Sequence, residues 1–161
     1  MSSVTTLTYM AFTAAEGSQR LLDNVAESIG ELEYALACLG EAYEVLDEYS
    51  GDQLEQQLFR PVQAALGRAK RTHAGFAARR GLTSAAVQAR PPGAPSLGAK
   101  ALVERAVDAL AVADAALATL QDSMLPVEVG DPELRAGLAE VRELMEGLRA
   151  RARELVRTLG R

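Results

Sequence analysis

Residues 22–46, LDNVAESIGELEYALACLGEAYEVL, decide the fold class. Apolar residues recur here at alternating steps of three and four, from Leu22 to Leu46. This spacing is that of the a and d positions of a heptad repeat, which share one face of an α-helix. A second row, at the g positions, consists of Leu21, Ser28, Ala35 and Ala42. The two rows together predict a helix whose buried face is wide enough for a helical bundle.

The same spacing recurs in three later segments of the chain. The expected core residues are Phe59, Val62, Leu66, Ala69, His73 and Phe76 in the first segment, Val103, Ala106, Leu110, Ala113, Leu117, Leu120 and Met124 in the second, and Leu134, Leu138, Val141, Met145, Leu148, Ala152, Leu155 and Leu159 in the third. We therefore predict an all-α protein, a four-helix bundle built from two successive antiparallel helical hairpins. The alternative is two hairpins that do not pack on each other.

The first turn of the chain is predicted from its capping residues. We expect the first helix to begin between Thr5 and Arg20, where Gly17 marks a possible start or kink, and to reach Tyr49. Gly51 suits a helix C-cap, because glycine readily takes the left-handed conformation. Asp52 followed by Glu55 three residues later resembles a capping box. The sequence thus predicts a structural turn at Tyr49, Gly51 and Asp52.

Proline and glycine set the remaining boundaries. The second helix is expected over 53–80, with a kink or a short first helix at Pro61, because proline lacks a backbone N–H. The segment 83–96 holds three prolines and a glycine and is a mobile loop or a long crossover. We predict one domain, 1–161, made of a first hairpin (1–82), a linker (83–96) and a second hairpin (97–161). In the second hairpin, helices run from about 97 to 124 and from Asp131-Pro132 onward, with aspartate as N-cap.

The composition and the N-terminal sequence bear on where in or outside the cell the protein is found. The single cysteine, Cys38, rules out a disulfide within the chain. The first 20 residues lack a basic start and a long apolar core, so no signal peptide is predicted. No apolar run approaches the roughly 18–20 residues of a membrane span. Arg outnumbers Lys 15 to two and Ala is abundant, which suggests a bacterium with a GC-rich genome. We predict a cytoplasmic protein, with secretion without a signal peptide as the alternative.

The sequence contains no recognisable catalytic or metal-binding motif. His73 is the only histidine and falls among the expected core residues, with no nucleophile or orienting acid identified beside it. One histidine and one cysteine are too few for a zinc site. A glycine-rich phosphate loop is missing as well. We predict a protein that is not an enzyme and that uses no cofactor.

Charge is distributed unevenly along the chain. Residues 1–59 carry 11 acids and one base, whereas residues 60–105 carry nine bases and one acid. Many of these charges fall outside the a and d positions, so they face solvent, another helix or a partner. The candidate partner-binding residues are the basic Arg68, Lys70, Arg71, Arg79 and Arg80 and the acidic ridge Glu41, Glu44 and Glu48. We predict a protein partner or self-association, as a homodimer or heteromer.

The basic second helix raises nucleic-acid binding as another hypothesis. Residues 60–80, RPVQAALGRAKRTHAGFAARR, hold six Arg or Lys and no acid, and basic patches attract phosphate. Against this, the whole chain has a net charge of −5, and Phe76 is the only Phe, Tyr or Trp in the run that could stack on a base.

The stretch Tyr49-Ser50-Gly51, between two expected long helices, resembles the Trp-x-Gly turn of the WxG-motif helical-hairpin proteins associated with type VII secretion. Tyr49 stands where that family has Trp, and Gly51 matches its glycine. The resemblance covers about residues 5–82 and implies an antiparallel hairpin that dimerises and leaves the cell without a cleaved signal. The chain departs from the family in lacking Trp. Its Tyr43 and Asp47 have the spacing of the family's export signal but precede the turn instead of following the second helix.

Overall fold

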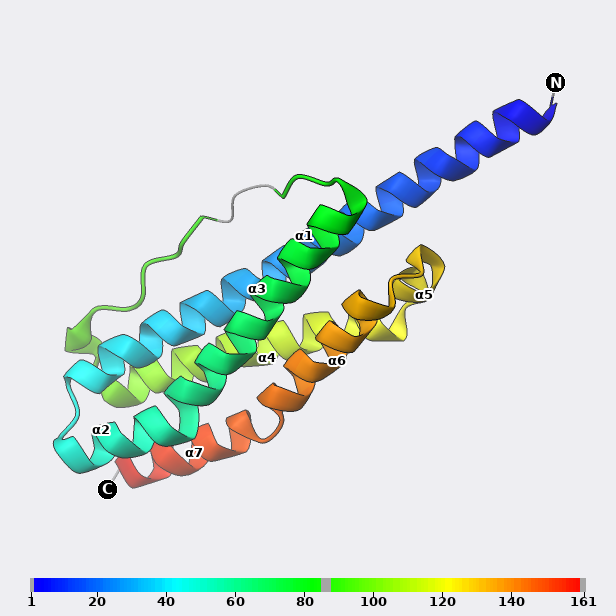
Figure 1. Cartoon of the computed structure of the whole chain (residues 1–161). Helices are drawn as coiled ribbons and strands as arrows, with labels where there is room; N and C mark the ends of the chain where they lie inside the picture. The colour runs from blue at the N-terminus through cyan, green and yellow to red at the C-terminus, as the bar shows by residue number, and fades with distance from the viewer. Residues whose placement is uncertain (1, 85–87, 160–161) are drawn as a thin grey trace.

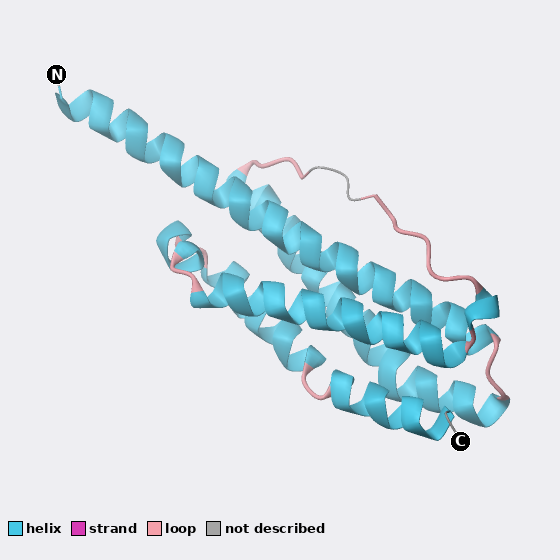
Figure 2. Ribbon diagram, turned by 180° about the vertical axis from the view of Figure 1, so that it is seen from behind, coloured by secondary structure: helices cyan, strands magenta, loops and turns pink. Residues whose placement is uncertain are grey.

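The computed structural model describes the backbone of residues 2–84 and 88–159 and the side chains of residues 14–84 and 88–159. All regular structure in these residues is helical, as predicted (Figures 1 and 2). The elements are α1 (Ser2–Glu44), α2 (Glu48–Leu54), the π-helical η1 (Glu55–Phe59), α3 (Arg60–Arg80), the 3-10 helix η2 (Pro95–Leu97), α4 (Ala99–Asp122), α5 (Leu125–Val129), α6 (Pro132–Met145) and α7 (Leu148–Leu159).

The long helices lie side by side in an elongated body (Figure 1). Helix α1 packs against both α3 and α4, and its contact with α4 is the more extensive. Helix α3 packs against α6, while α4 contacts α6 and α7. Helices α4 and α6 therefore pack against α1 and α3.

The predicted apolar rows form the core between these helices. Of the first segment, Leu22, Val25, Ile29, Leu32 and Leu39 are buried. The g row, Leu21, Ser28, Ala35 and Ala42, is buried as well. Because three of its members are small, neighbouring backbones can approach α1 closely. Met124 is an exception to the predicted core, being 62% exposed.

Helix α1 begins earlier and ends earlier than the sequence predicted. It starts at Ser2 and runs without a break through Gly17. Gly17 is neither a start nor a kink: it leaves room for α5, since a Cβ added there would lie 3.2 Å from Leu125 Cδ1. The helix stops at Glu44, five residues before Tyr49.

The predicted structural turn at Tyr49, Gly51 and Asp52 is wrong, because all three residues lie inside α2. The chain reverses at residues 45–47 instead. The N-cap is Asp47, whose carboxylate accepts a hydrogen bond from the backbone N–H of Ser50 at 2.8 Å. A hydrogen bond with the Ser50 side chain, together with this backbone bond, holds the pKa of Asp47 below its usual value.

The irregularity predicted near Pro61 takes the form of a π-helical segment. The chain remains helical from α2 through η1 into α3, and the backbone N–H of Arg60 donates to the carbonyl of Glu55, five residues back. Pro61 has no N–H to donate, so the ordinary ladder is interrupted at this point. The extra residue in this turn accommodates the proline within a continuous helical segment.

A crossover connects α3 to α4. Helix α3 ends at Arg80, the predicted end of the second helix, and Gly81 follows it in the left-handed conformation (φ 62°). The N–H of Leu82 donates to the carbonyl of Ala77 at 2.9 Å. The chain then runs back along the outside of the body to the start of α4 (Figure 2). Part of the predicted linker, residues 85–87, lies outside the described residues.

The last predicted helix is two helices. Asp131 caps α6 as predicted, accepting from the N–H of Leu134 at 2.9 Å. The helix ends at Met145, and Gly147 takes a positive φ of 77° before α7 begins. The apolar spacing continues in phase across this break, so it gave no sign of the interruption.

Candidate interaction surfaces

Most of the basic residues proposed for partner binding are engaged within the chain. Arg68 Nε lies 2.6 Å from Glu140 Oε2 on α6. Lys70 Nζ lies 3.2 Å from Glu33 Oε1 on α1. Arg71 is exposed and has no ion pair with any described residue. Most of the candidate basic side chains of α3 thus pair with acids of neighbouring elements.

Asp131 joins the end of α3 to the start of α6. The guanidinium of Arg79 donates two hydrogen bonds to its carboxylate, at 2.8 and 3.0 Å, and Arg80 Nε lies 3.8 Å away. The side chain of Asp131 is only 6% exposed. The hydrogen bonds from Arg79 hold the pKa of Asp131 below its usual value, because they favour the charged form. This carboxylate therefore remains charged and buried at neutral pH.

The two helices joined by Asp131 cross at very short range at Thr72 and Gly137. A Cβ added to Gly137 would lie 2.6 Å from Thr72 Cγ2 and 2.9 Å from Thr72 Cβ, and closer still to Oγ1. Thr72 Oγ1 donates to the carbonyl of Arg68 at 2.8 Å, which satisfies its hydroxyl. Glycine is therefore required at this crossing for steric reasons.

The acidic ridge lies at the end of the molecule where α1 gives way to α2. We call residues 41–52 the tip. Glu44 and Glu48 are exposed and Glu41 is half-buried. None of the three forms an ion pair with a residue in the described part of the chain. Their charges are thus available to another molecule.

Exposed apolar side chains accompany these acids. Tyr49 is 74% exposed, Val45 44% and Tyr43 43%. The Tyr43 ring lies over α2, where a Cβ added to Gly51 would be 3.3 Å from Tyr43 Cε2. Tyr43 falls within the 3-4 spacing of residues 22–46, which predicts burial, but α1 ends one residue later and leaves Tyr43 at the edge of the core. The tip therefore combines aromatic surface with negative charge.

The other end of α1 projects beyond the body. Figure 1 shows the N-terminal part of the helix extending past α5, which is packed beside Gly17. The sequence of this part, MSSVTTLTYMAFTAA over residues 1–15, contains no charged residue.

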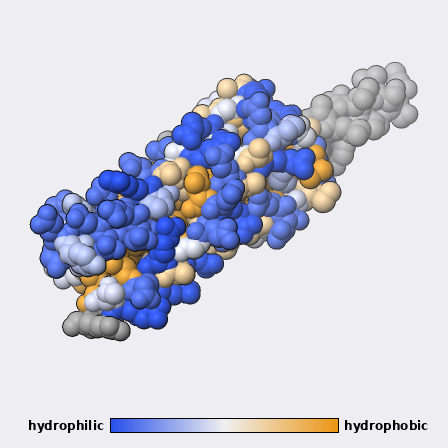
Figure 3. Space-filling view, turned by 60° about the horizontal axis from the view of Figure 1, so that its bottom comes forward, coloured by the Kyte–Doolittle hydropathy of each residue, from blue (hydrophilic) through white to orange (hydrophobic). Residues whose placement is uncertain are grey.

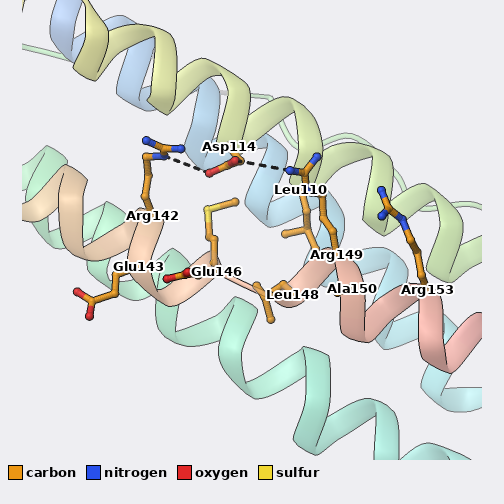
Figure 4. Close-up of a pocket in the computed structure, with 11 residues that line it drawn as sticks. Leu110, Asp114, Arg142, Glu143, Glu146, Leu148, Arg149, Ala150 and Arg153 are labelled. Carbon is orange, nitrogen blue, oxygen red and sulfur yellow. Dashed lines mark hydrogen bonds and ion pairs between the residues drawn. The ribbon is translucent and has the colours of Figure 1, made fainter.

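The α6–α7 break borders a cavity of about 550 Å³ against α4 (Figure 4). Asp114 on α4 accepts from Arg142 at 3.2 Å, and Arg149 lies 4.0 Å from the same carboxylate. Arg142 also donates to Gln121 at 2.8 Å. These ion pairs link α6 and α7, on either side of the break, to the same aspartate of α4.

The single histidine, His73, is half-buried on α3, and the single cysteine, Cys38, lies on α1. His73 Nε2 is buried without a hydrogen-bond partner, and burial lowers the pKa of His73, against a smaller opposing effect of Asp23. Cys38 is fully buried. Within the described residues, no cluster of three or more His, Cys, Asp or Glu side chains is arranged to hold a metal ion.

One contact was missed by the sequence reasoning. Arg90, in the crossover, lies 4.1 Å from the centre of the Tyr34 ring and 2.7 Å from Glu31 Oε2. Both partners are on α1, so this arginine attaches the crossover to the body. The sequence held one sign of this contact: Arg90 is the single arginine of the proline-rich linker 83–96, and the first helix is rich in acids.

Comparisons with protein-family models, with curated proteins and with solved structures found no match for this chain. Among the described residues, no helix is both long enough and apolar enough to cross a membrane.

Proposed function

We propose that this protein is a non-enzymatic protein–protein interaction module, a helical adaptor or structural subunit of an assembly. We further propose that it acts as a four-helix bundle of two antiparallel hairpins, in which α1, α2–α3, α4 and α6–α7 form the four members. The packing of α1 on α3 and α4, and of α6 on α3 and α4, supports this arrangement.

The observation that carries the proposal is the projection of α1 (Figure 1). From Ser2 to Glu16 the helix extends roughly 22 Å at 1.5 Å per residue. Isolated helices of this length are marginal in water, since most helical stability in proteins comes from packing of an apolar face. A partner, or a second copy of the chain, would supply that packing.

The test is the oligomeric state and the partners of the native chain. We expect light scattering at several concentrations to give a dimer or larger species, or a stable partner to co-purify from lysate. A charge placed in the uncharged segment, Met10→Glu, should weaken that association while leaving the helical content nearly unchanged. The same change at exposed Ala139, Ala139→Glu, is the matched control. A wild-type chain that is monomeric throughout and captures no partner would contradict the proposal.

Secretion without a signal peptide, as in WxG-like hairpin proteins, is kept as a second candidate. An antiparallel pair, α1 and α2–α3, in the first half of the chain is consistent with it. The deciding measurement is whether untagged protein appears in the culture medium while a cytoplasmic marker stays inside the cells. Retention inside would leave the cytoplasmic adaptor as the remaining proposal.

Nucleic-acid binding has weaker support than protein binding. Arg68, Lys70, Arg79 and Arg80 are each paired with an acid of the same chain. Phosphate would have to compete with these carboxylates. A lack of retention on DNA and RNA at about 50 mM salt would remove this alternative.

A further inference from the structure

We propose that the tip docks a basic amphipathic helix of a partner protein. This inference rests on the proposed function and specifies where the partner binds and which chemistry it presents. The surface is formed by Tyr43, Val45 and Tyr49 together with the carboxylates around them, and it continues into a groove against α7.

Most of the negative charge of the tip is not paired with basic side chains of the described residues. Residues 41–55, which are the tip and the three residues that follow it, contain six acids and no Arg or Lys. Glu55 is paired with Arg60 at 3.6 Å, and Asp47 is used to cap α2. The other four, Glu41, Glu44, Glu48 and Asp52, have no ion pair among the described residues. Carboxylates gathered in this way create a negative potential that favours a cationic partner and repels an acidic one.

The apolar part of the tip adds a reason for a protein partner instead of simple cations. Three of the seven large apolar residues that are strongly exposed in the described part of the chain lie within residues 43–49. Tyrosine is common at the centres of protein interfaces, because its ring buries a large area and its hydroxyl still reaches a polar group. A lysine or arginine of the partner can lie over such a ring while meeting a carboxylate.

A groove beside Tyr49 provides space for an apolar side chain of the partner. It has a volume of about 380 Å³ and lies between α2–η1 and α7, with Gln53 and Gln57 on one side and Leu155 on the other. Arg151 lines the α7 side, so the basic side chains of the partner are expected on the α2 side, near Glu48 and Asp52. An amphipathic helix fits this division, since one of its faces is apolar and its flanks are basic.

The test uses the full chain and a fluorescent, synthetic Lys/Leu amphipathic helix, with a Glu/Leu helix of the same pattern as the reference peptide. Affinity is measured by fluorescence anisotropy at low and moderate salt. We expect the Lys/Leu helix to bind and the Glu/Leu helix not to bind. Tyr49→Ala, at a 74% exposed side chain, should weaken binding about tenfold, which corresponds to about 1.4 kcal/mol.

A matched pair of double variants separates the tip from the overall acidity of the protein. Glu48→Gln with Asp52→Asn removes two carboxylates one helical turn apart in α2, and Glu104→Gln with Asp108→Asn removes two with the same spacing in α4. All four residues are exposed and without an ion pair among the described residues. The α2 pair should weaken binding about threefold to tenfold, which lies within the range that two exposed charge contacts can contribute. The α4 pair should leave affinity within about twofold of wild type.

Each contrary outcome identifies what has failed. Equal weakening by both double variants would overturn the docking site in favour of non-specific attraction. Loss of self-association in the Tyr49→Ala variant would also overturn it, because the tip would then be an interface between copies. If the Lys/Leu helix does not bind while the chain still associates through α1, the tip proposal fails and the interaction function stands. If both measurements are negative, both proposals fail.

Discussion

Replacing Gly137 with alanine should destabilise the protein, although alanine is normally the better helix former. Ala favours a helix over Gly by about 1 kcal/mol. Against that gain, the new Cβ would lie within 2.9 Å of Thr72 Cβ, an atom attached directly to the α3 backbone. Because that atom cannot rotate away, α3 and α6 must separate, and overpacking of this kind costs about 1–3 kcal/mol or more. At the upper end of this range, we expect a net loss of about 2 kcal/mol.

Thermal and urea denaturation, followed by circular dichroism, measure this loss. For a chain of this size 2 kcal/mol corresponds to a decrease in Tm of about 4–8 °C. The control is Gly40→Ala, in α1, where an added Cβ meets nothing within 4 Å. That variant should instead gain about 0.5–1 kcal/mol. If Gly137→Ala is as stable as Gly40→Ala, the close crossing of α3 and α6 does not exist.

A second variant localises the effect. Thr72→Ala removes the Oγ1 and Cγ2 atoms that the new methyl group would meet, but it keeps the Cβ atom. In the Gly137→Ala background it should therefore restore part of the lost stability, with a coupling energy of about 1 kcal/mol in a double-mutant cycle. Strictly additive effects of the two substitutions would mean that the residues are not in contact.

Three further predictions concern single side chains. Because burial lowers the pKa of His73, the unfolded chain binds the proton more readily, so the free energy of unfolding should fall as pH decreases below about 6.5. In urea titrations, His73→Gln should reduce the dependence of this free energy on pH between about pH 7.5 and 5.5, and an unchanged dependence would refute the lowered pKa of His73. Asp131→Ala removes an N-cap and leaves Arg79 without its buried partner, so it should cost about 2–4 kcal/mol in denaturation experiments, whereas exposed Glu133→Ala should cost less than about 1 kcal/mol. Gly147→Ala, at a φ of 77°, should cost about 1 kcal/mol, and a stabilised variant would show that α6 and α7 form one continuous helix.

The sequence predicted which faces are buried better than where helices end. The 3-4 spacing depends only on angle around a helix axis, and it predicted burial for residues such as Leu22 and Leu138. A helix end depends on which polar side chain reaches a free backbone N–H. The sequence predicted the first turn from the capping pattern at Asp52 and Glu55. Asp47 caps α2 in the structure, so the reversal occurs five residues earlier.

Of the candidate surfaces, some features could be predicted from the sequence and others could not. The acidic ridge could be predicted, because an uninterrupted excess of acids needs no tertiary information. The pairing of the basic residues could not be predicted, because the partner of Arg68 lies 72 positions away in the sequence and that of Arg79 lies 52 positions away. The sequence also gave no indication that Tyr43 is exposed, since this residue continues the heptad spacing up to the end of α1.

Helix α1 connects the two surfaces proposed for contact with other molecules. Its projecting start and the tip lie at opposite ends of one helix of 43 residues, which spans about 65 Å at 1.5 Å per residue. Two molecules bound at these ends would be held apart at a nearly constant distance and would not touch each other. The protein would then act as a spacer of defined length, and the separation between bound partners would be set by the number of residues in a single helix.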